Sequence, residues 1–373
     1  MHKKGSINEL VRLFLRLGII GFGGPAVHIS MMEEEVVRKR KWMSHQHFLD
    51  LVGATNLITG PNSTEMVMHI GNERAGSKGL VVAGLCFIMP AIILTAILAW
   101  LYSLYGKLPE VQPFLYGIKP AVIAIIINAM FILGRKVLKT IQLGIIGLLS
   151  AVAVIVGVNE IIVLFTAGFI GILIFILSNR RGLLNSIFPF ILLQVVYPPG
   201  YNGMKLFLIF LKVGALLYGS GYVLFAFLDA ELVTRGWLTK QQLIDAIAAG
   251  QFTPGPVFSS ATFIGWQVGG LGGAVAATIG IFLPSFLFVV LLNPLIPKLR
   301  NSKVMSAFLD TVNIASIAII LAVVLEMGKE SMNDWRTILI TVLSFITLFY
   351  FKKLNSAFIV AGGSIAGYLL WLI

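Results

Sequence analysis

The chain has 373 residues, of which 58% are hydrophobic and only 12% charged, with a mean hydropathy of +0.93. A soluble domain carries about 25% charged residues, so the composition excludes a soluble protein and indicates one surrounded by membrane lipid. The formal net charge of +12 does not indicate a nucleic-acid partner, because the basic residues lie in short loops beside apolar runs, as in the cytoplasmic loops of membrane proteins.

The first two apolar elements, residues 10–32 and 46–70, contain breaks. The first holds Gly23, Gly24 and Pro25, and the second holds Thr59-Gly60-Pro61. Glycine permits positive φ, and proline removes an N–H and favours the first turn of a helix. Such breaks persist at membrane depth only where they are buried in protein or line a wet cavity. We expect each element to be a hairpin that returns to the side it entered from; the alternative is a kinked full span.

Apolar runs of spanning length follow the two broken elements. We expect full spans at residues 79–106, 112–134, 141–157 and 160–178, and a short connecting span at residues 183–199. The predicted organisation is a first repeat over residues 1–181, a connecting span and loop over 182–203, and a second repeat over 204–373.

The second half repeats the landmarks of the first. Phe14-Leu15-Arg16-Leu17-Gly18 matches Phe210-Leu211-Lys212-Val213-Gly214, and the first break matches Gly219, Ser220 and Gly221; Trp42-Met43-Ser44 matches Trp237-Leu238-Thr239, and Thr59-Gly60-Pro61 matches Thr253-Pro254-Gly255-Pro256. Chance similarity between apolar helices would not align Trp, Pro and Gly at nearly constant spacing. The chain is therefore predicted to be an internal duplication.

The positions of the basic residues favour opposite orientations of the two halves. If the N-terminus is cytoplasmic and the second half is inverted, most of the 28 Lys and Arg residues lie on the cytoplasmic side. Parallel halves would place the basic loops of one half outside. We therefore predict an all-α polytopic membrane protein of two inverted-topology repeats, each with two broken, hairpin-like elements and about four full transmembrane helices. The C-terminus is expected on the periplasmic face of a prokaryotic inner membrane.

The breaks predict a binding site for an anion. A half-helix that begins at Pro61 or Pro256 directs free N–H groups and the positive end of its dipole at what precedes it, and paired broken helices mark the binding sites of transporters. The candidate substrate-binding residues are Gly23, Gly24, Pro25, Asn56, Thr59, Gly60, Pro61, Asn62 and Ser63 in the first half, and Gly219, Ser220, Gly221, Gln251, Thr253, Pro254, Gly255, Pro256 and Ser259 in the second.

Three cations within membrane segments are candidates for the countercharge. Arg16 and Lys212 occupy equivalent repeat positions before the glycine breaks, and Lys119 precedes Pro120 within a span. An intramembrane cation is costly and indicates function. Arg16 and Lys212 could instead extend toward an interface.

Four further titratable residues, His28, Glu33, Glu65 and His69, are candidates for proton coupling or gating. Ion pairing at the interface for Glu33 and polar packing for the histidines are the alternatives. With Cys86 as the only cysteine, we expect no metal site and no cofactor. No P-loop is present, which disfavours ATP-driven transport. No nucleophile elbow or HExxH motif is present, so we do not expect an enzyme.

Taken together, these motifs resemble the chromate transporter family, in its long-chain form with both repeats. The resemblance is carried by Phe22-Gly23-Gly24-Pro25-Ala26-x-His28, Trp42-Met43-Ser44, Gly60-Pro61, Phe87-x-x-Pro90 and Phe252-Thr253-Pro254-Gly255-Pro256. It implies a secondary transporter that exports chromate, with sulfate as a related oxyanion. The chain departs from the family pattern at Thr59 and Asn56, where proline and glutamine are usual.

Two other functions remain open from the sequence. One is an ion-coupled carrier for a different small solute, and the other is an anion channel. The channel would need a continuous polar stripe, whereas the polar residues here cluster at the breaks. The oligomeric state is also open, with a homodimer as one option.

Overall fold

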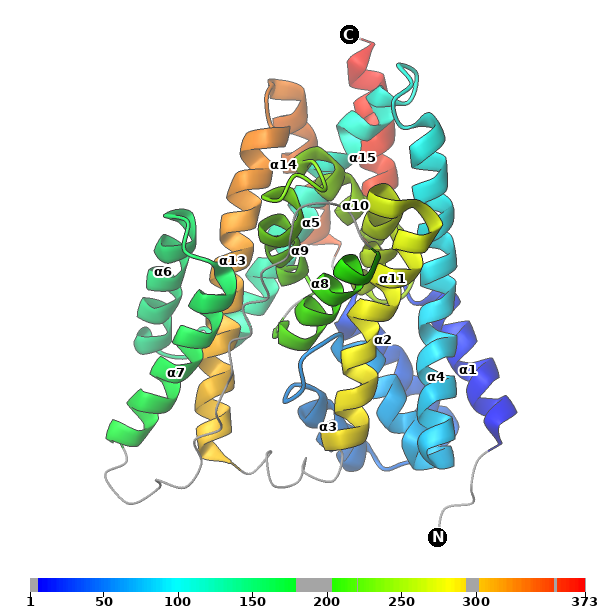
Figure 1. Cartoon of the computed structure of the whole chain (residues 1–373), viewed down its shortest axis with the longest axis vertical. Coiled ribbons are helices and arrows are strands. Elements are labelled where there is room, and N and C mark those ends of the chain that lie inside the picture. The colour runs from blue at the N-terminus through cyan, green and yellow to red at the C-terminus, as the bar shows by residue number, and fades with distance from the viewer. Residues whose placement is uncertain (1–5, 179–202, 220, 293–301, 352–353, 373) are drawn as a thin grey trace.

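The computed structural model describes residues 6–178, 203–219, 221–292, 302–351 and 354–372 (Figure 1). The expected connecting span at residues 183–199 and the break residue Ser220 lie outside these residues. All regular elements in the described ranges are helical, as predicted. The first half contains α1 (Ile7–Ile20), α2 (Pro25–Glu33), the π-helical turn η1 (Glu34–Lys39), α3 (His45–Thr55), α4 (Asn62–Tyr105), α5 (Gln112–Val137), α6 (Ile141–Ile155) and α7 (Glu160–Ser178).

The second half repeats this order. It contains α8 (Gly203–Leu216), α9 (Val223–Leu228), the π-helical turn η2 (Asp229–Val233), α10 (Lys240–Phe252), the 3₁₀ turn η3 (Val257–Ser259), α11 (Ser260–Leu292), α13 (Lys303–Ser331), α14 (Trp335–Tyr350) and α15 (Ser356–Trp371). The predicted spans agree with α5, α6 and α7, and the predicted span at residues 79–106 is the second segment of α4. Even the π-helical turns occur at matching places in the two halves.

The outer surface is apolar, as a lipid environment requires. Five helices in the described part of the chain are long and apolar enough to cross a membrane. Large side chains such as Ile141, Val156 and Leu148 are 85%, 77% and 66% exposed. Because water would disfavour so much exposed apolar surface, these side chains are expected to face lipid.

The two broken elements of the first half are hairpins. Arg74, near the kink of α4, lies 3.4 Å from Glu9 at the start of α1 and 4.5 Å from the centre of the Trp42 ring after η1. Since these three residues meet at one end of the molecule, both intervening segments enter and return. The return is followed by a reversal at Gly76, whose φ of 62° suits glycine.

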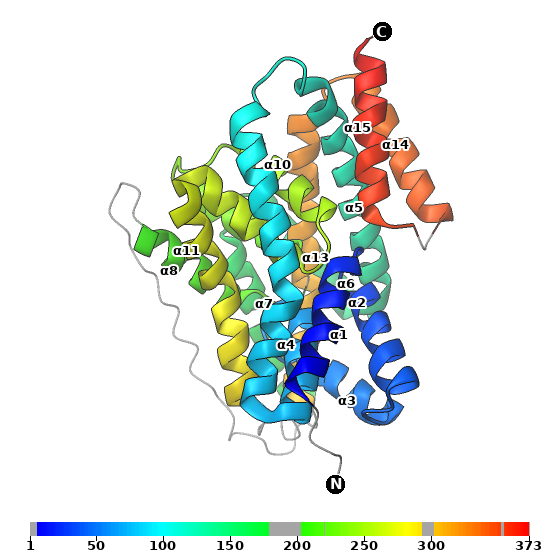
Figure 2. The same ribbon diagram turned by 90° about the vertical axis from the view of Figure 1, so that its right-hand side faces the viewer.

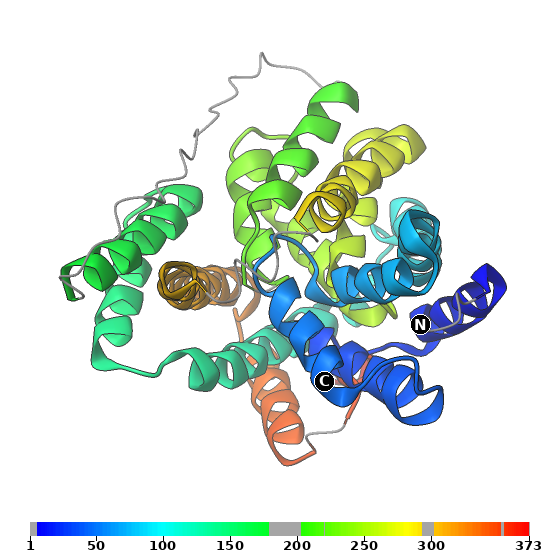
Figure 3. The same ribbon diagram turned by 90° about the horizontal axis from the view of Figure 1, so that it is seen from below.

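The second half has the opposite orientation. Gln267, just before the kink of α11 at Gly270, donates to the carbonyl of Ala99 at 3.3 Å, near the far end of α4. In Figures 1 and 2, α4 rises from its kink while α11 descends from its own, and the two termini lie at opposite ends. The predicted inverted repeat is therefore confirmed. In the view from below (Figure 3), the green helices α6 and α7 lie at one edge, beyond α13.

Glycine allows the close approach of α5 and α15. A Cβ on Gly117 would lie 2.0 Å from the carbonyl oxygen of Gly363 and 2.6 Å from Cα of Gly367. Within a membrane, where lipid is as apolar as leucine, such backbone contact is a main source of helix association.

This contact predicts that Gly117→Ala lowers the unfolding temperature of the purified protein in detergent, with a loss of about 1–3 kcal/mol typical of overpacking. Gly134→Ala is the matched control, because it lies on the same helix and a Cβ added there would meet no heavy atom within 4 Å. Equal unfolding temperatures for the two variants would contradict the packing.

Candidate functional site

The broken helices of the two halves are joined by a pair of equivalent backbone hydrogen bonds. The N–H of Gly60 donates to the carbonyl of Leu217 at 3.0 Å, and the N–H of Gly255 donates to the carbonyl of Gly21 at 2.7 Å. Gly21 and Leu217 are the residues that follow α1 and α8. Each second break is thus tied to the first break of the other half, so all four breaks converge.

Glycine is required at this junction. Gly60 and Gly255 have φ values of 130° and 92°, in the region that side-chain-bearing residues avoid. A Cβ on Gly60 would also lie 2.3 Å from Oγ of Ser285 and 2.5 Å from Oε1 of Glu65. Ser285 directly follows Pro284 of α11, which corresponds to Pro90 of α4 in the first half. This matching pair of prolines was a sequence signal that could have identified Ser285.

Buried polar side chains line the junction. Thr59, Ser63, Gln251, Thr253 and Ser259 are each at least nine-tenths buried. Thr253 and Ser259 share a hydrogen bond of 3.4 Å. Oγ1 of Thr59 has no hydrogen-bond partner in the described structure, and the Gln251 side chain has the Tyr222 hydroxyl as its neighbour. The arrangement leaves hydrogen-bonding capacity inside the protein, next to two helix starts that no side chain caps.

Further polar residues join the junction from positions that the sequence analysis did not single out. Thr95 of α4 donates to Oγ of Ser259 at 3.3 Å, and thus links the two halves. Ser316 of α13 donates to the carbonyl of Tyr218 at 3.1 Å, beside the break at Gly219. These contacts join residues far apart in the chain, for which no local motif exists.

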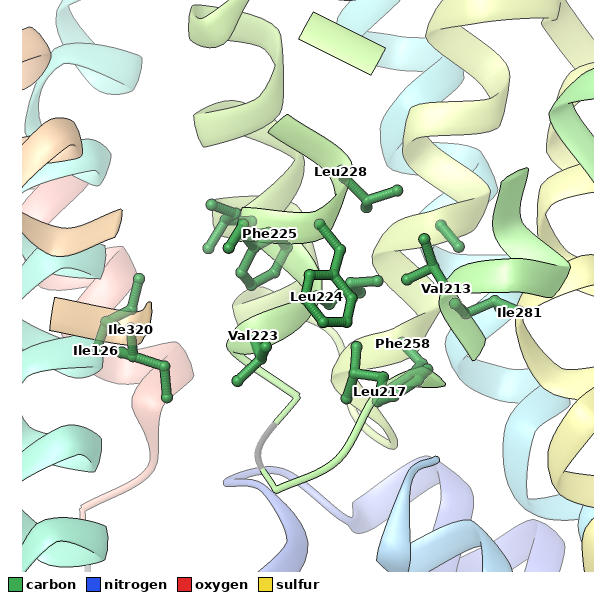
Figure 4. Packing of buried hydrophobic residues seen from close by; sticks show 14 of the residues in the cluster. Ile126, Val213, Leu217, Val223, Leu224, Phe225, Leu228, Phe258, Ile281 and Ile320 are labelled. Atoms are coloured by element: carbon green, nitrogen blue, oxygen red, sulfur yellow. The ribbon is translucent and has the colours of Figure 1, made fainter. Parts of the chain in front are cut away.

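Not every predicted binding residue lies in this buried set. Asn56 is exposed and accepts from Asn62 at 2.8 Å, so these two asparagines bond to each other. Gly23 and Pro25 are also exposed. Apolar side chains surround the matching break before α9, where Figure 4 shows Leu217, Val223 and Phe258 gathered around the loop.

The three candidate cations are each paired with a carboxylate. Arg16 lies 4.0 Å from Glu35, Lys212 lies 2.6 Å from Glu231, and Lys119 lies 3.6 Å from Asp245. Lys119 is the most buried of the three, with 17% of its side chain exposed, whereas 62% of the Arg16 side chain is exposed. The Lys119–Asp245 pair joins α5 of the first half to α10 of the second, and Tyr102 donates to the same carboxylate at 2.6 Å.

Two of these pairs belong to a duplicated cluster at the π-helical turns. In the first half, Glu35 also pairs with Lys39 at 2.9 Å. In the second, Glu231 also pairs with Arg235 at 2.9 Å. Arg40 is a third partner of Glu35, so one buried carboxylate meets three cations in the first cluster and two in the second. Such π-helical turns often mark functional positions. A cavity of about 400 Å³ adjoins the first cluster and is lined in part by Ser30, Glu33 and Arg38.

The four coupling or gating candidates lie in different environments. Nε2 of His28 lies 2.8 Å from the carbonyl oxygen of Gly21, so this imidazole is hydrogen-bonded to the backbone at the first break. Glu33 lies at the cavity, 3.4 Å from both Arg38 and His45. His69 and Glu65 are buried in α4, and Glu65 lies against Gly60 at the junction.

Comparisons with known proteins agree over the whole chain. The family profile described as Chromate transporter matches residues 8–172 and, separately, residues 204–368. The chain is 32% identical to the probable chromate transport protein of Synechococcus elongatus, over 100% of this chain and 97% of that protein. It is 31% identical to the chromate transport protein of Cupriavidus metallidurans and 29% identical to that of Pseudomonas aeruginosa, over 97% and 98% of this chain and 92% and 93% of those proteins. No solved structure gives a significant match.

The buried pair between the halves predicts a stability effect. Lys119→Met or Asp245→Asn alone leaves one charge uncompensated and should cost about 3–5 kcal/mol, whereas the double variant should recover most of the loss. Thermal unfolding in detergent measures this. The control pair is Lys139–Asp310, which is 59% and 36% exposed and should give effects below about 1 kcal/mol. Single variants of Lys119 and Asp245 no worse than these controls would contradict the prediction.

Proposed function

We propose that this chain, which belongs to the chromate transporter family, exports chromate across the cytoplasmic membrane of a prokaryote, with sulfate as a related substrate. Members of the family are membrane transport proteins and not enzymes. The observation that carries the substrate class is the convergence of two uncapped helix starts and buried hydroxyl groups at one junction between the halves.

A tetrahedral oxyanion suits this junction. Its oxygens accept several hydrogen bonds at once, and the first N–H groups of the helices that begin after Pro61 and Pro256 have no partner within their own helix. Ser63 and Ser259 add hydroxyl donors from the same two helix starts. We propose that the anion binds between these starts, near mid-membrane, with the breaks at residues 23–25 and 219–221 closing the site.

The countercharge is proposed to come mainly from Lys119. Lys119 is the most buried of the three candidate cations. The residue at the equivalent position of the second repeat is Asn313, whose Oδ1 would lie 3.5 Å from a Cβ added to Gly219. Arg16 and Lys212 belong to the clusters at the π-helical turns. Since those clusters lie one in each inverted repeat, they are proposed to act in opening and closing the two sides of the protein.

The proposed anion site predicts that Gly60→Ala and Gly255→Ala impair transport. A side chain at these positive φ values costs about 1–3 kcal/mol, so the population of the competent junction and the chromate flux should fall about 5- to 150-fold. The measurement is chromate flux into proteoliposomes of purified protein, with sulfate and molybdate in parallel. Gly53→Ala on α3, where nothing lies within 4 Å, is the control. Normal flux through both junction variants would exclude the site.

The proposed orientation places the N-terminus in the cytoplasm and the C-terminus in the periplasm, because most basic loop residues then lie inside. A reporter enzyme active only in the cytoplasm should therefore work when fused to the N-terminus and remain silent at the C-terminus. Activity at both ends would contradict the inverted arrangement, and activity at the C-terminus alone would reverse the orientation.

A further inference from the structure

Glu65 is a carboxylate without a charged partner at the centre of the protein. Its side chain is 0% exposed, and no ion pair to it occurs among the described residues. The Ser285 hydroxyl is its hydrogen-bonding neighbour, although neither carboxylate oxygen has a partner of normal geometry. Its Oε1 and the Ser285 hydroxyl lie on the same side of Gly60, where a Cβ would meet both. The carboxylate therefore faces the junction between the halves.

Among the described residues, no cation on the elements around Glu65 forms an ion pair with it. Helix α11, which supplies Ser285, contains no titratable side chain. The titratable residues on the other elements packed against α4 are Glu9, Arg12 and Arg16 on α1, His28 and Glu33 on α2, His45, His47 and Asp50 on α3, and Lys240 and Asp245 on α10. Tyr218, before the α8–α9 break, and His69, one turn further along α4, complete the set.

Five of the basic residues among these have other partners, and one of the five, His45, lies 3.4 Å from Glu33. Arg16 pairs with Glu35, Lys240 pairs with Glu326, and His47 lies 2.5 Å from Glu73. His28 is bonded to the Gly21 carbonyl. A carboxylate enclosed in this way without a cation is strongly disfavoured in its ionised form, and such groups are neutralised by taking up a proton.

Glu65 also shares its helix start with the proposed anion. It lies in the first turn of α4, so an ionised carboxylate would compete with the oxyanion for the same positive helix end. Two like charges in one site disfavour each other, whereas the protonated carboxyl group is neutral and can donate a hydrogen bond. Binding of the anion and binding of a proton therefore favour each other, and this linkage is reciprocal.

From this geometry we infer that Glu65 is a proton-binding site, and that one proton travels with each oxyanion through the protein. This inference rests on the proposed oxyanion site. When the site opens to water, the carboxyl group releases its proton; when the anion enters, the carboxylate takes a proton from water, and no bond to the anion forms. A chromate dianion with one proton still carries net negative charge, so a membrane potential that is negative inside favours its export.

The test uses purified full-length protein in proteoliposomes loaded with a pH-sensitive dye, with the membrane potential clamped. A chromate gradient should move protons in the same direction as chromate, at about one per anion. Glu65→Gln should carry chromate with little proton movement, because the amide cannot titrate. Glu73→Gln, a surface carboxylate of the same helix, should behave like the wild type.

A second readout is the half-saturating chromate concentration. The ratio of the wild-type value to the Glu65→Gln value should fall by up to about tenfold for each pH unit of acidification, because one proton is linked to binding. Protonation of chromate in solution affects both proteins alike, so their ratio isolates Glu65.

The outcomes separate the two proposals. Absence of chromate flux through the wild type overturns the proposed function and this inference with it. Chromate flux without proton movement in the wild type overturns the inference alone, whatever the behaviour of the variant. Proton movement that persists in Glu65→Gln would show that the proton travels on the anion. A requirement for sodium without proton movement would assign the site to that cation. Either result would also overturn the inference about Glu65.

Discussion

The structure depends on two backbone hydrogen bonds that cross between its halves. Each break between two helices would leave N–H and C=O groups unsatisfied at membrane depth, where no lipid can pair with them. The bond from Gly60 to Leu217 and its counterpart from Gly255 to Gly21 satisfy part of this need by making each half complete the other. Neither half can therefore hold its breaks in this form alone. The same constraint brings the remaining uncapped helix starts together, which creates a polar centre in an otherwise apolar protein.

Inversion of the repeats gives this centre two equivalent approaches. The clusters around Glu35 and Glu231 share one plan, a buried carboxylate paired with a cation four residues later and with one on the first helix of its half, and belong to halves of opposite orientation. Where the symmetry fails, the differences are chemical: Lys119 corresponds to Asn313, and Glu65 has no acidic counterpart in the stretch Ser259-Ser260. A binding site needs only one such cation and one titratable group, so the asymmetric residues are those to which we assign the countercharge and the proton.

Much of the fold was predictable because glycine and proline at membrane depth have few explanations. The runs at Gly23-Gly24-Pro25 and Thr59-Gly60-Pro61 predicted the breaks, and the matching second-half motifs predicted the duplication. The charge distribution predicted the inversion. The site was harder to predict from the sequence, because its contacts join elements that are distant in the chain. Nothing near Lys119 in the chain predicts its partner Asp245, and nothing near Ser259 predicts its partner Thr95. Asn56 was chosen for its polarity, but it lies just after the end of α3, where it is exposed and bonds to Asn62.

The most direct measurement of the central claim is an experimental structure of the full chain with chromate or selenate, whose heavy atom can be located by anomalous scattering. Our account predicts a single peak between the two helix starts, with its oxygens within hydrogen-bond distance of the backbone N–H groups after Pro61 and Pro256. A peak instead in the cavity beside Arg16 and Glu33, with none at the junction, would contradict it.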